Sequence, residues 1–133
     1  ISIGIGLSPH YLIDKKGIIK ATRLAMKQAV EQLSPPPQSL LIDYMRLPEV
    51  KLPQKGVPDG DSLCLSIACA SIIAKVVRDR MMGALDARYP VYGFAAHAGY
   101  GTARHLAALK AHGPCMHHRL SFAPLRQDLI EGL

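Results

Sequence analysis

The stretch from Asp61 to Arg80 limits the possible folds of this chain more than any other. Its apolar or small residues recur at steps of three and four, which places one stripe on one face of an α-helix: Leu63, Ile67, Ala70, Ala74, Val77 and Met81. A side-chain oxygen of Asp61 or Ser62 is placed to cap the first turn. The pattern predicts the buried central helix of an α/β domain, which runs to about Arg88.

Length and composition bound the classes of protein to which the chain can belong. Its 133 residues, 49% of them hydrophobic, suffice for one domain with its own core and exclude a disordered chain. We expect residues 1–133 to form a single domain, on which residues 102–133 pack as a helical, basic tail. A net charge of +6 weakly favours a polyanionic partner.

Cysteine usage and the apolar runs bear on the compartment. The three cysteines are an odd number without a Cys-x-x-Cys pair, which favours free thiols in a reducing compartment, and therefore a cytoplasmic protein. No apolar run reaches the roughly 20 residues that span a bilayer, so we expect no membrane partner.

The first half of the chain alternates strand and helix patterns. Residues 1–7 predict a strand whose glycines let another backbone pass close, and the pattern starts so abruptly at Ile1 that we expect residues before it. Residues 11–16 predict one helical turn, and residues 18–33 a longer helix that the following prolines stop. Residues 40–43 predict a buried strand, and residues 46–58 an irregular excursion with a short strand at 55–57.

The second half contains a loop rich in tyrosine and glycine before another helix. Thr102 is a candidate N-cap for this helix, and Gly113-Pro114 is expected to end it. The basic tail, residues 117–124, predicts turns, with a last helical turn after Arg126.

Two aspartates are the first candidates for chemistry. Asp43 ends a hydrophobic strand, where a carboxylate binds a cation or caps a turn, and residue context leaves both interpretations open. For Asp61 the N-cap interpretation is favoured by context alone. Aspartates on adjacent elements can hold Mg²⁺ or Mn²⁺, although a site for two ions usually needs three or four carboxylates. Asp79, between two arginines, most simply forms ion pairs.

Other site classes find little support. The histidine spacings match no zinc motif, and the serine-hydrolase and P-loop signatures do not occur. Tyr100, in a glycine loop, either stacks on a sugar or base of a nucleic acid or packs on a helix end.

Several consecutive segments together resemble one family. The segments are Leu41-Ile-Asp43 with Arg46-Leu-Pro48, Gly60-Asp61-Ser62, Ser66-Ile-Ala-Cys-Ala-Ser-Ile-Ile-Ala-Lys-Val-Val-Arg-Asp79, Tyr92-Gly-Phe-Ala95, His97, Gly99-Tyr-Gly-Thr102, and His118-Arg119 with Ser121-Phe122. In this order they resemble the bacterial type 2 ribonucleases H (ribonuclease HII) over nearly the whole chain.

The resemblance implies a ribonuclease H-like α/β fold, a mixed sheet flanked by helices that is incomplete at the N-terminus and has a helical C-terminal region. It implies metal-dependent cleavage of RNA in RNA–DNA hybrids and of DNA at embedded ribonucleotides, with 5′-phosphate and 3′-hydroxyl ends. Asp43 and Asp61 match two of the four ligands for Mg²⁺ or Mn²⁺, and Tyr100 matches the tyrosine that senses the ribose–deoxyribose junction. We expect a monomer.

The resemblance also suggests roles for further residues. Candidate ligands for backbone phosphates are Arg46, Lys75, Arg78 and Arg119, and candidate supporting residues are Asp79 and Ser71.

The chain also departs from the family pattern. The family's opening Asp-Glu-x-Gly-Arg-Gly segment is absent, Tyr44 replaces a glycine, Asp59 replaces a lysine, and Ala96 and Ala98 replace lysines. We therefore expect the 133-residue chain alone to be inactive, as the C-terminal part of a longer enzyme. The alternative is a non-catalytic module that binds nucleic acid.

Overall fold

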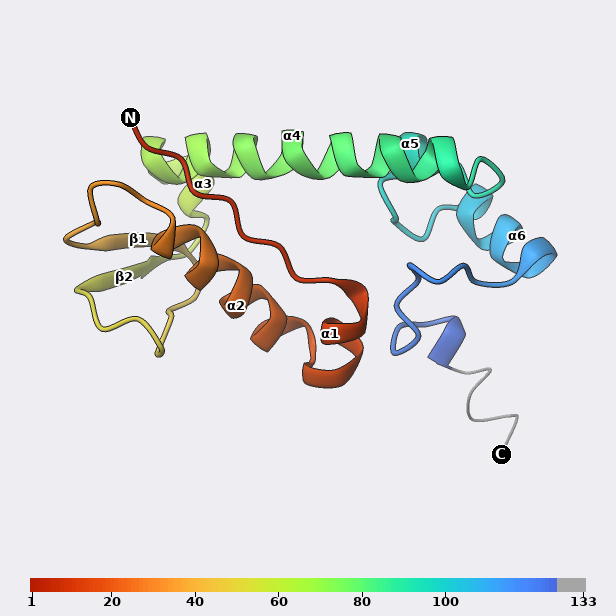
Figure 1. The fold of residues 1–133 in the computed structure, drawn as a ribbon, viewed down its shortest axis with the longest axis horizontal. Coiled ribbons are helices and arrows are strands. Elements are labelled where there is room, and N and C mark those ends of the chain that lie inside the picture. Colours follow the sequence, from red (N-terminus) through yellow and green to blue (C-terminus); the bar gives the residue numbers. More distant parts are fainter. Residues whose placement is uncertain (127–133) are drawn as a thin grey trace. The chain divides into compact units, whose positions relative to one another are not determined.

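The computed structural model describes residues 1–126, which form two compact units that we treat separately. The first comprises Ile1–Ile67 with the described part of His117–Leu133, and the second comprises Ala68–Met116. Figure 1 shows the elements in chain order: α1 (His10–Lys16), α2 (Ile18–Glu31), β1 (Leu40–Asp43), β2 (Gln54–Val57), α3 (Gly60–Leu63), α4 (Leu65–Arg88), α5 (Phe94–His97) and α6 (Ala103–His112). The parallel sheet and the helices confirm the expected α/β class.

A two-stranded parallel sheet forms the centre of the first unit. β1 and β2 lie where the sequence predicts strands, and Asp43 at the end of β1 is in register with Val57. Side chains alternate along β1, so that Leu40 and Ile42 are buried whereas Asp43 is exposed. The alternation therefore places the carboxylate of Asp43 outside the apolar core.

The connection between the strands, residues 44–53, is irregular as expected and is held by one side chain. The carboxamide of Gln54 accepts a hydrogen bond from the Leu47 N–H and donates to the carbonyls of Leu47 and Val50. Leu47 is thereby fixed in the core beside the strands. The core of this unit contains Leu40, Ile42 and Leu47, against which pack Met26, Val30, Met45, Val50 and Leu52.

The predicted helices of the first half are confirmed. α1 and α2 are separated by Gly17, whose φ of +82° lies in the region that favours glycine. α2 ends at Glu31, before the prolines that were expected to stop it.

The predicted strand over residues 1–7 is wrong, because this segment is extended but has no strand partner among the described residues. Figure 1 shows it running along α2. The predicted close passage of another backbone is confirmed: a Cβ on Gly4 would lie 1.9 Å from the Ala29 carbonyl oxygen, and one on Gly6 would lie 1.7 Å from that of Ala25. The two glycines therefore allow the segment to pack closely against the backbone of α2.

Two glutamine side chains replace the missing strand partner. Gln32 accepts from the Ile5 N–H and donates to the Ile5 carbonyl, and Gln28 accepts from the Leu7 N–H. The backbone of the segment is therefore bonded to α2 by carboxamides.

The predicted helix from Asp61 to Arg88 is interrupted. α3 ends at Leu63, Cys64 has extended backbone angles (φ −134°, ψ 116°), and α4 begins at Leu65. The predicted capping by Asp61 or Ser62 is also wrong, because Asp59 is the N-cap of α3 and no side chain caps that helix.

The expectation that the central helix is buried is wrong as well. Ile67 is the buried residue of α4, whereas Leu63 and Met81 of the predicted stripe are 74% and 44% exposed. The apolar periodicity of the stripe therefore does not by itself mean that the helix is buried.

The second unit contains α4 from Ala68 onward, α5 and α6. The predicted cap of α6 is confirmed, because the Thr102 hydroxyl accepts a hydrogen bond from the His105 N–H (3.3 Å). α6 ends at Gly113 as predicted, and the Gly113 carbonyl accepts a hydrogen bond from the Tyr92 hydroxyl.

The described part of the tail contains turns, as expected, and the predicted helical turn after Arg126 lies outside the described residues. None of the described helices combines the length and the apolar character needed to cross a membrane.

Candidate functional site

The end of β1 and the start of α3 bring Asp43 close to the backbone that carries Asp61. The Gly60 N–H donates a hydrogen bond of 2.9 Å to Oδ1 of Asp43. The glycine at position 60 allows this close approach. A Cβ there would lie 3.3 Å from Asp43 Oδ1 and only 2.7 Å from Cδ1 of Ile67. The two aspartates therefore come from adjacent elements, which are joined by a hydrogen bond from a backbone N–H to the Asp43 carboxylate.

A tight turn follows Asp43 and redirects the chain at the end of the strand. The Met45 N–H donates to the Asp43 carbonyl (2.7 Å), which closes a three-residue turn around Tyr44, whose φ is +61°. This left-handed region is strained for a bulky side chain. Glycine would adopt this φ without strain.

The donor chemistry of the two aspartates fits a hard divalent cation. Both residues are exposed, and none of the described residues donates a hydrogen bond to the carboxylate of Asp61. Carboxylate oxygens are the ligands that Mg²⁺ and Mn²⁺ prefer. Among residues 1–126, however, no three Asp, Glu, His or Cys side chains gather as a metal site, so the described ligand set is incomplete for two ions.

Asp14 shows how a carboxylate is occupied when its role is structural. Its oxygens accept hydrogen bonds from the Leu120 N–H, the Ser121 N–H and the Ser121 hydroxyl. Burial alone would raise the pKa of Asp14, but these hydrogen bonds, with the charge of His10, outweigh burial and lower it. No local sequence pattern singles out Asp14, because its partners lie 106 and 107 residues further along the chain.

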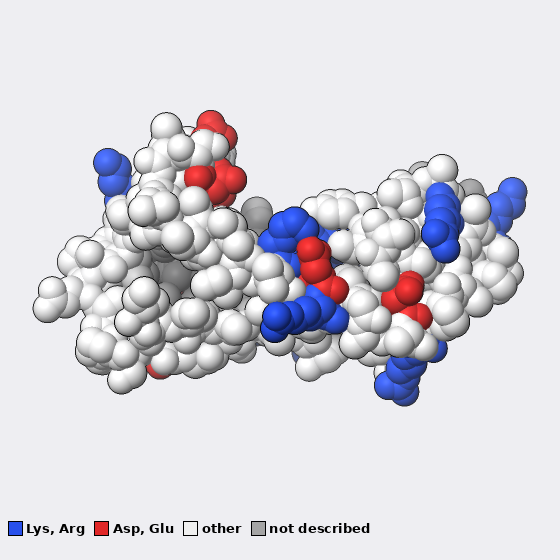
Figure 2. Space-filling view, turned by 90° about the horizontal axis from the view of Figure 1, so that it is seen from above, with Lys and Arg blue, Asp and Glu red and all other residues white. Residues whose placement is uncertain are grey.

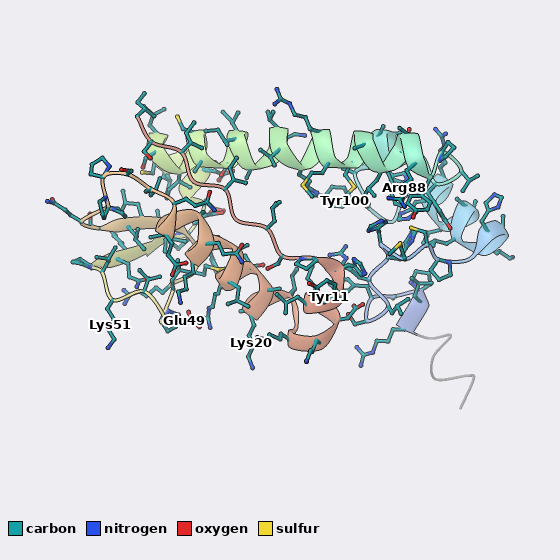
Figure 3. All side chains as sticks on the ribbon, viewed as in Figure 1. Tyr11, Lys20, Glu49, Lys51, Arg88 and Tyr100 are labelled. Carbon is teal, nitrogen blue, oxygen red and sulfur yellow. The ribbon has the colours of Figure 1, made fainter. Side chains whose placement is uncertain are left out.

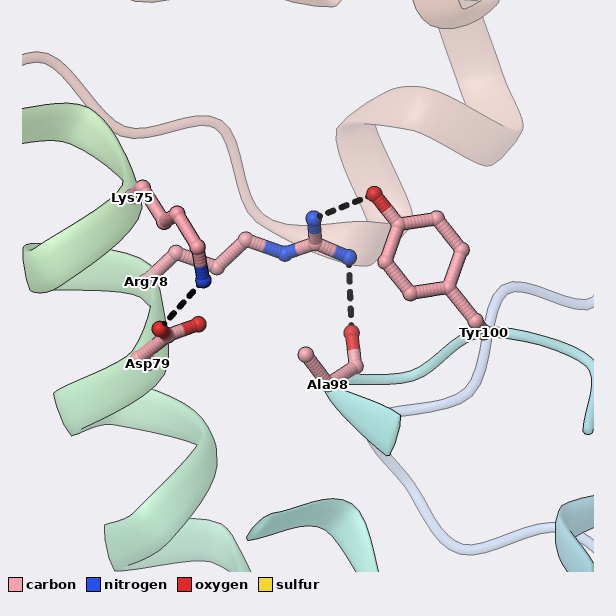
Figure 4. A network of polar contacts seen from close by, with 5 residues as sticks. All are labelled: Lys75, Arg78, Asp79, Ala98 and Tyr100. Atoms are coloured by element: carbon pink, nitrogen blue, oxygen red, sulfur yellow. Dashed lines mark hydrogen bonds and ion pairs between the residues drawn. The ribbon is translucent and has the colours of Figure 1, made fainter. Parts of the chain in front are cut away.

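In the second unit, Arg78 and Tyr100 form a contact that sequence analysis did not predict. Figure 4 shows the Arg78 guanidinium donating to the Tyr100 hydroxyl (3.0 Å) and to the Ala98 carbonyl (2.7 Å). The guanidinium carbon lies 4.7 Å from the centroid of the Tyr100 ring. The hydrogen bond from Arg78 is the main cause that lowers the pKa of Tyr100.

The loop that carries Tyr100 rests on two buried histidines. The rings of His97 and His105 stack with centroids 4.3 Å apart. His97 Nδ1 accepts from the Gly99 N–H, so its Nε2 carries the proton that is donated to the Tyr92 carbonyl. His105 Nδ1 lies 2.9 Å from the Tyr100 carbonyl oxygen and bonds it. These histidines bind backbone, and Tyr100 remains 64% exposed beside them.

The other predicted basic ligands and supporting residues lie in different settings. Lys75 is paired with Asp79 one turn along α4 (2.6 Å, Figure 4), which agrees with the ion-pair interpretation of Asp79. Arg46 is exposed in the connection after β1, and Ser71 is exposed on α4. The guanidinium of Arg119 lies 4.0 Å from the centroid of the Phe122 ring.

On the face that Figure 2 shows, the basic side chains do not form one continuous patch. Figure 2 shows Lys and Arg in separate small groups on the face in view, several beside Asp or Glu, with uncharged surface between them. Lys20 and Lys51, labelled in Figure 3, both point away from the ribbon.

Comparison with known proteins gives one family. The sequence model of ribonuclease HII matches residues 6–125. A curated ribonuclease HII of Dehalococcoides mccartyi (strain BAV1) is 54% identical over 133 residues, which cover 100% of this chain and 62% of the relative. Ribonuclease HII of Desulfitobacterium hafniense (strain DCB-2) is 54% identical over 97% of this chain and 50% of its own length, and that of Geobacillus kaustophilus is 52% identical over 97% and 49%. The chain thus spans between 49% and 62% of the length of these relatives.

Proposed function

The chain belongs to the ribonuclease HII family, and from this membership we propose that it is part of a divalent-metal-dependent endonuclease. The proposed substrates are the RNA strand of RNA–DNA hybrids and duplex DNA that contains ribonucleotides. The observation that carries the proposal is the hydrogen bond from Gly60 to Asp43, which joins the elements of two exposed aspartates. We further propose that the protein works in the cytoplasm as a monomer, with residues 1–133 as one part of its catalytic domain.

In this proposal Asp43 and Asp61 hold Mg²⁺ or Mn²⁺ through their carboxylate oxygens. A cation bound there supplies Lewis-acid stabilisation of the charge on the phosphate and activates a water molecule. Asp43 keeps a fixed orientation because Gly60 bonds one of its oxygens, which leaves the other to face a ligand. Hydrolysis leaves 5′-phosphate and 3′-hydroxyl ends. Asp79 and Ser71 have supporting roles.

Substrate binding is assigned to residues outside the acidic pair. Arg46, Lys75, Arg78 and Arg119 are the phosphate candidates, and Arg46 is supported best because its exposed side chain lies close in sequence to Asp43. Such contacts give affinity that depends on salt and not on sequence. Tyr100 presents an exposed ring suited to stack on a sugar at a junction of ribose and deoxyribose.

Two aspartates are fewer than the three or four carboxylates that a site for two metal ions usually requires. We therefore propose that this 133-residue polypeptide does not turn over by itself and that further acidic ligands complete the site. Incubation of the polypeptide with a labelled RNA–DNA hybrid and Mn²⁺ should give no cleavage on a denaturing gel. Metal-dependent cleavage would contradict this part of the proposal.

The metal assignment is tested by Mn²⁺ binding, measured by electron paramagnetic resonance of free Mn²⁺. Asp43→Asn and Asp61→Asn should each weaken binding about tenfold or more, because each removes a charged oxygen ligand. The matched control is Glu49→Gln, an exposed carboxylate in the connection between the strands (Figure 3), which should leave Mn²⁺ binding unchanged. Equal affinities in all four proteins would exclude the proposed ligands.

A non-catalytic nucleic-acid-binding module is the second candidate, and the strained Tyr44 beside Asp43 favours it. A module of this kind would bind a labelled hybrid with an affinity that falls as salt rises, while Asp43→Asn and Asp61→Asn leave Mn²⁺ binding unchanged. Loss of Mn²⁺ binding in both variants would instead favour the enzyme.

A further inference from the structure

The Arg78 guanidinium uses two of its nitrogens to fix two atoms of one loop. Nη1 donates to the Tyr100 hydroxyl oxygen at 3.0 Å, and Nη2 donates to the Ala98 carbonyl at 2.7 Å (Figure 4). A planar guanidinium with two bonds to one partner segment holds that segment in one orientation. Arg78 therefore joins α4 to both the backbone and the ring of the Tyr100 loop.

This loop contains residues that would move easily without such bonds. Ala98 and Gly99 have φ of +49° and +83°, and Gly99 has no side chain that could pack. Histidines fix the backbone around them, since His97 bonds the Gly99 N–H and His105 bonds the Tyr100 carbonyl. These two bonds go to backbone atoms, whereas Arg78 bonds the tyrosine hydroxyl, so the direction of the exposed phenol depends on Arg78.

We infer that Arg78 is a positioning residue, which aims the Tyr100 ring and leaves the phenol O–H free to donate to a substrate oxygen. Because Arg78 donates to the phenol oxygen, the phenol proton points elsewhere, and none of the described residues accepts it. The atom it recognises is thus an acceptor, such as the 2′-oxygen of a ribose. The inference rests on the proposed function of Tyr100, and it removes Arg78 from the set of phosphate ligands.

The acidity of the phenol agrees with this arrangement. The hydrogen bond and the charge of Arg78 lower the pKa of Tyr100, Lys75 lowers it further, and Asp79 acts in the opposite direction. A more acidic O–H is a stronger hydrogen-bond donor. Removal of Arg78 should consequently make Tyr100 titrate at higher pH.

The first experiment measures this titration without nucleic acid. Ionisation of the five tyrosines is followed by absorbance at alkaline pH, and subtraction of the Tyr100→Phe curve isolates Tyr100. In Arg78→Ala the isolated midpoint should move to higher pH, and in Arg78→Lys it should lie between the two, because lysine keeps the charge but not the planar pair of donors. Arg80→Ala, an exposed arginine on the same helix, is the control and should not move it. An unchanged midpoint in Arg78→Ala overturns the inference.

The second experiment measures binding of a labelled DNA duplex with one embedded ribonucleotide, by fluorescence anisotropy. Arg78→Ala should weaken binding about tenfold in the natural chain and less than about twofold in a Tyr100→Ala background, because its effect passes through the ring. The slope of log affinity against log salt should not change. Additive losses, or a slope reduced by about 0.9, would show instead that Arg78 binds a phosphate directly.

The two measurements separate the two proposals. If the titration shifts but the ribonucleotide duplex does not bind, Arg78 still positions Tyr100. The assignment of a substrate oxygen as the acceptor of the phenol proton is then overturned, together with the proposed function. Binding that depends on Tyr100 but not on Arg78 would overturn the positioning role and leave the proposed function standing.

Discussion

The acidic pair of the first unit and the Arg78–Tyr100 pair of the second are built in different ways. Asp43 is oriented by backbone: a parallel strand ends at it, a tight turn follows it, and the Gly60 N–H bonds its carboxylate. Tyr100 is oriented by a side chain, because Arg78 reaches from α4 to its hydroxyl. The acidic pair therefore depends on a glycine that allows close backbone approach, whereas the Arg78–Tyr100 pair depends on the hydrogen bonds of an arginine side chain.

This difference predicts which kind of substitution damages each site. Adding a methyl group should harm the acidic pair, since glycines make its close backbone contacts. Removing side-chain atoms should harm the tyrosine loop, since buried imidazoles and a guanidinium hold it.

In this series of substitutions, Gly56→Ala should have the largest effect on stability. A Cβ there would lie 2.9 Å from the carbonyl oxygens of both Tyr44 and Met45, and these backbone atoms have little room to move. We expect a loss of about 1–3 kcal/mol in the free energy of unfolding, measured with urea. At Gly83 of α4 a Cβ would meet no atom within 4 Å apart from its own helix. The same substitution there should instead raise the free energy of unfolding by up to about 1 kcal/mol. Equal changes in stability at both glycines would show that close backbone contacts do not determine the effect of an added methyl group.

His97→Ala should be the most damaging truncation in the second unit. It removes the donor to the buried Tyr92 carbonyl and the acceptor of the partly buried Gly99 N–H, so both backbone groups lose their bond to His97. A loss of about 1–3 kcal/mol is expected, with faster hydrogen exchange in residues 98–101. Lys110→Ala, at an exposed position of α6, should change stability by less than about 0.5 kcal/mol. An unchanged stability of His97→Ala, with residues 98–101 still protected from exchange, would show that the loop keeps its conformation without His97.

Asp14→Asn tests a carboxylate whose role is structural. Since the folded-state pKa of Asp14 is lowered, its stabilisation is complete above the unfolded value of about 3.9 and is lost as pH falls through the folded pKa. The substitution should cost about 1 kcal/mol at pH 7, where the carboxylate is charged. The natural and variant chains should converge in stability below about pH 3, in urea titrations across this range. A difference that persists in acid would assign the effect to packing.

Tyr44→Gly should stabilise the first unit, which would sharpen the backbone side of the comparison. Glycine adopts a φ of +61° without strain, and after its greater freedom in the unfolded chain is subtracted we expect a gain of about 0.5–1 kcal/mol. Asp59→Gly is the matched change at φ +50°, where aspartate is tolerated better and the gain should be smaller. A destabilised Tyr44→Gly variant would show that the exposed tyrosine ring makes contacts that outweigh the strain.

Lys75→Ala should have the smallest effect. Its ion pair with Asp79 is exposed, and such pairs contribute less than about 0.5 kcal/mol. Thermal unfolding in low and high salt should give nearly the same small difference between the natural chain and the variant. A loss above about 1 kcal/mol would mean that Lys75 supports the neighbouring Arg78 more than its geometry indicates.

Local patterns predicted the elements that local forces build. A short apolar run bounded by turn formers located β1 and hence Asp43, and the Thr102 hydroxyl together with Gly113 located both ends of α6. The break at Cys64 was missed because the apolar steps continue through it and neither proline nor glycine marks it. The burial predicted for α4 failed because periodicity identifies a face without showing what covers it.

Only part of the candidate site was accessible from sequence. Asp43 and Asp61 were found by their positions at element ends, and their roles stay predictions. The Gly60 N–H bond to Asp43 joins residues 17 positions apart, and Arg78 meets Tyr100 across 22 positions. No helical or strand periodicity connects such partners, so their contacts needed a three-dimensional structure.

The bonds between Asp14 and residues 120–121 have a consequence for the order in which the chain is made. A ribosome has to add more than 100 further residues after Asp14 before its partners exist, since the bonded positions are 106 and 107 residues apart. Until then Asp14 of α1 lacks its hydrogen-bond donors at residues 120–121, and the whole second unit is synthesised in the meantime. The first unit should thus close only late in translation, as the last of its contacts across a long stretch of sequence.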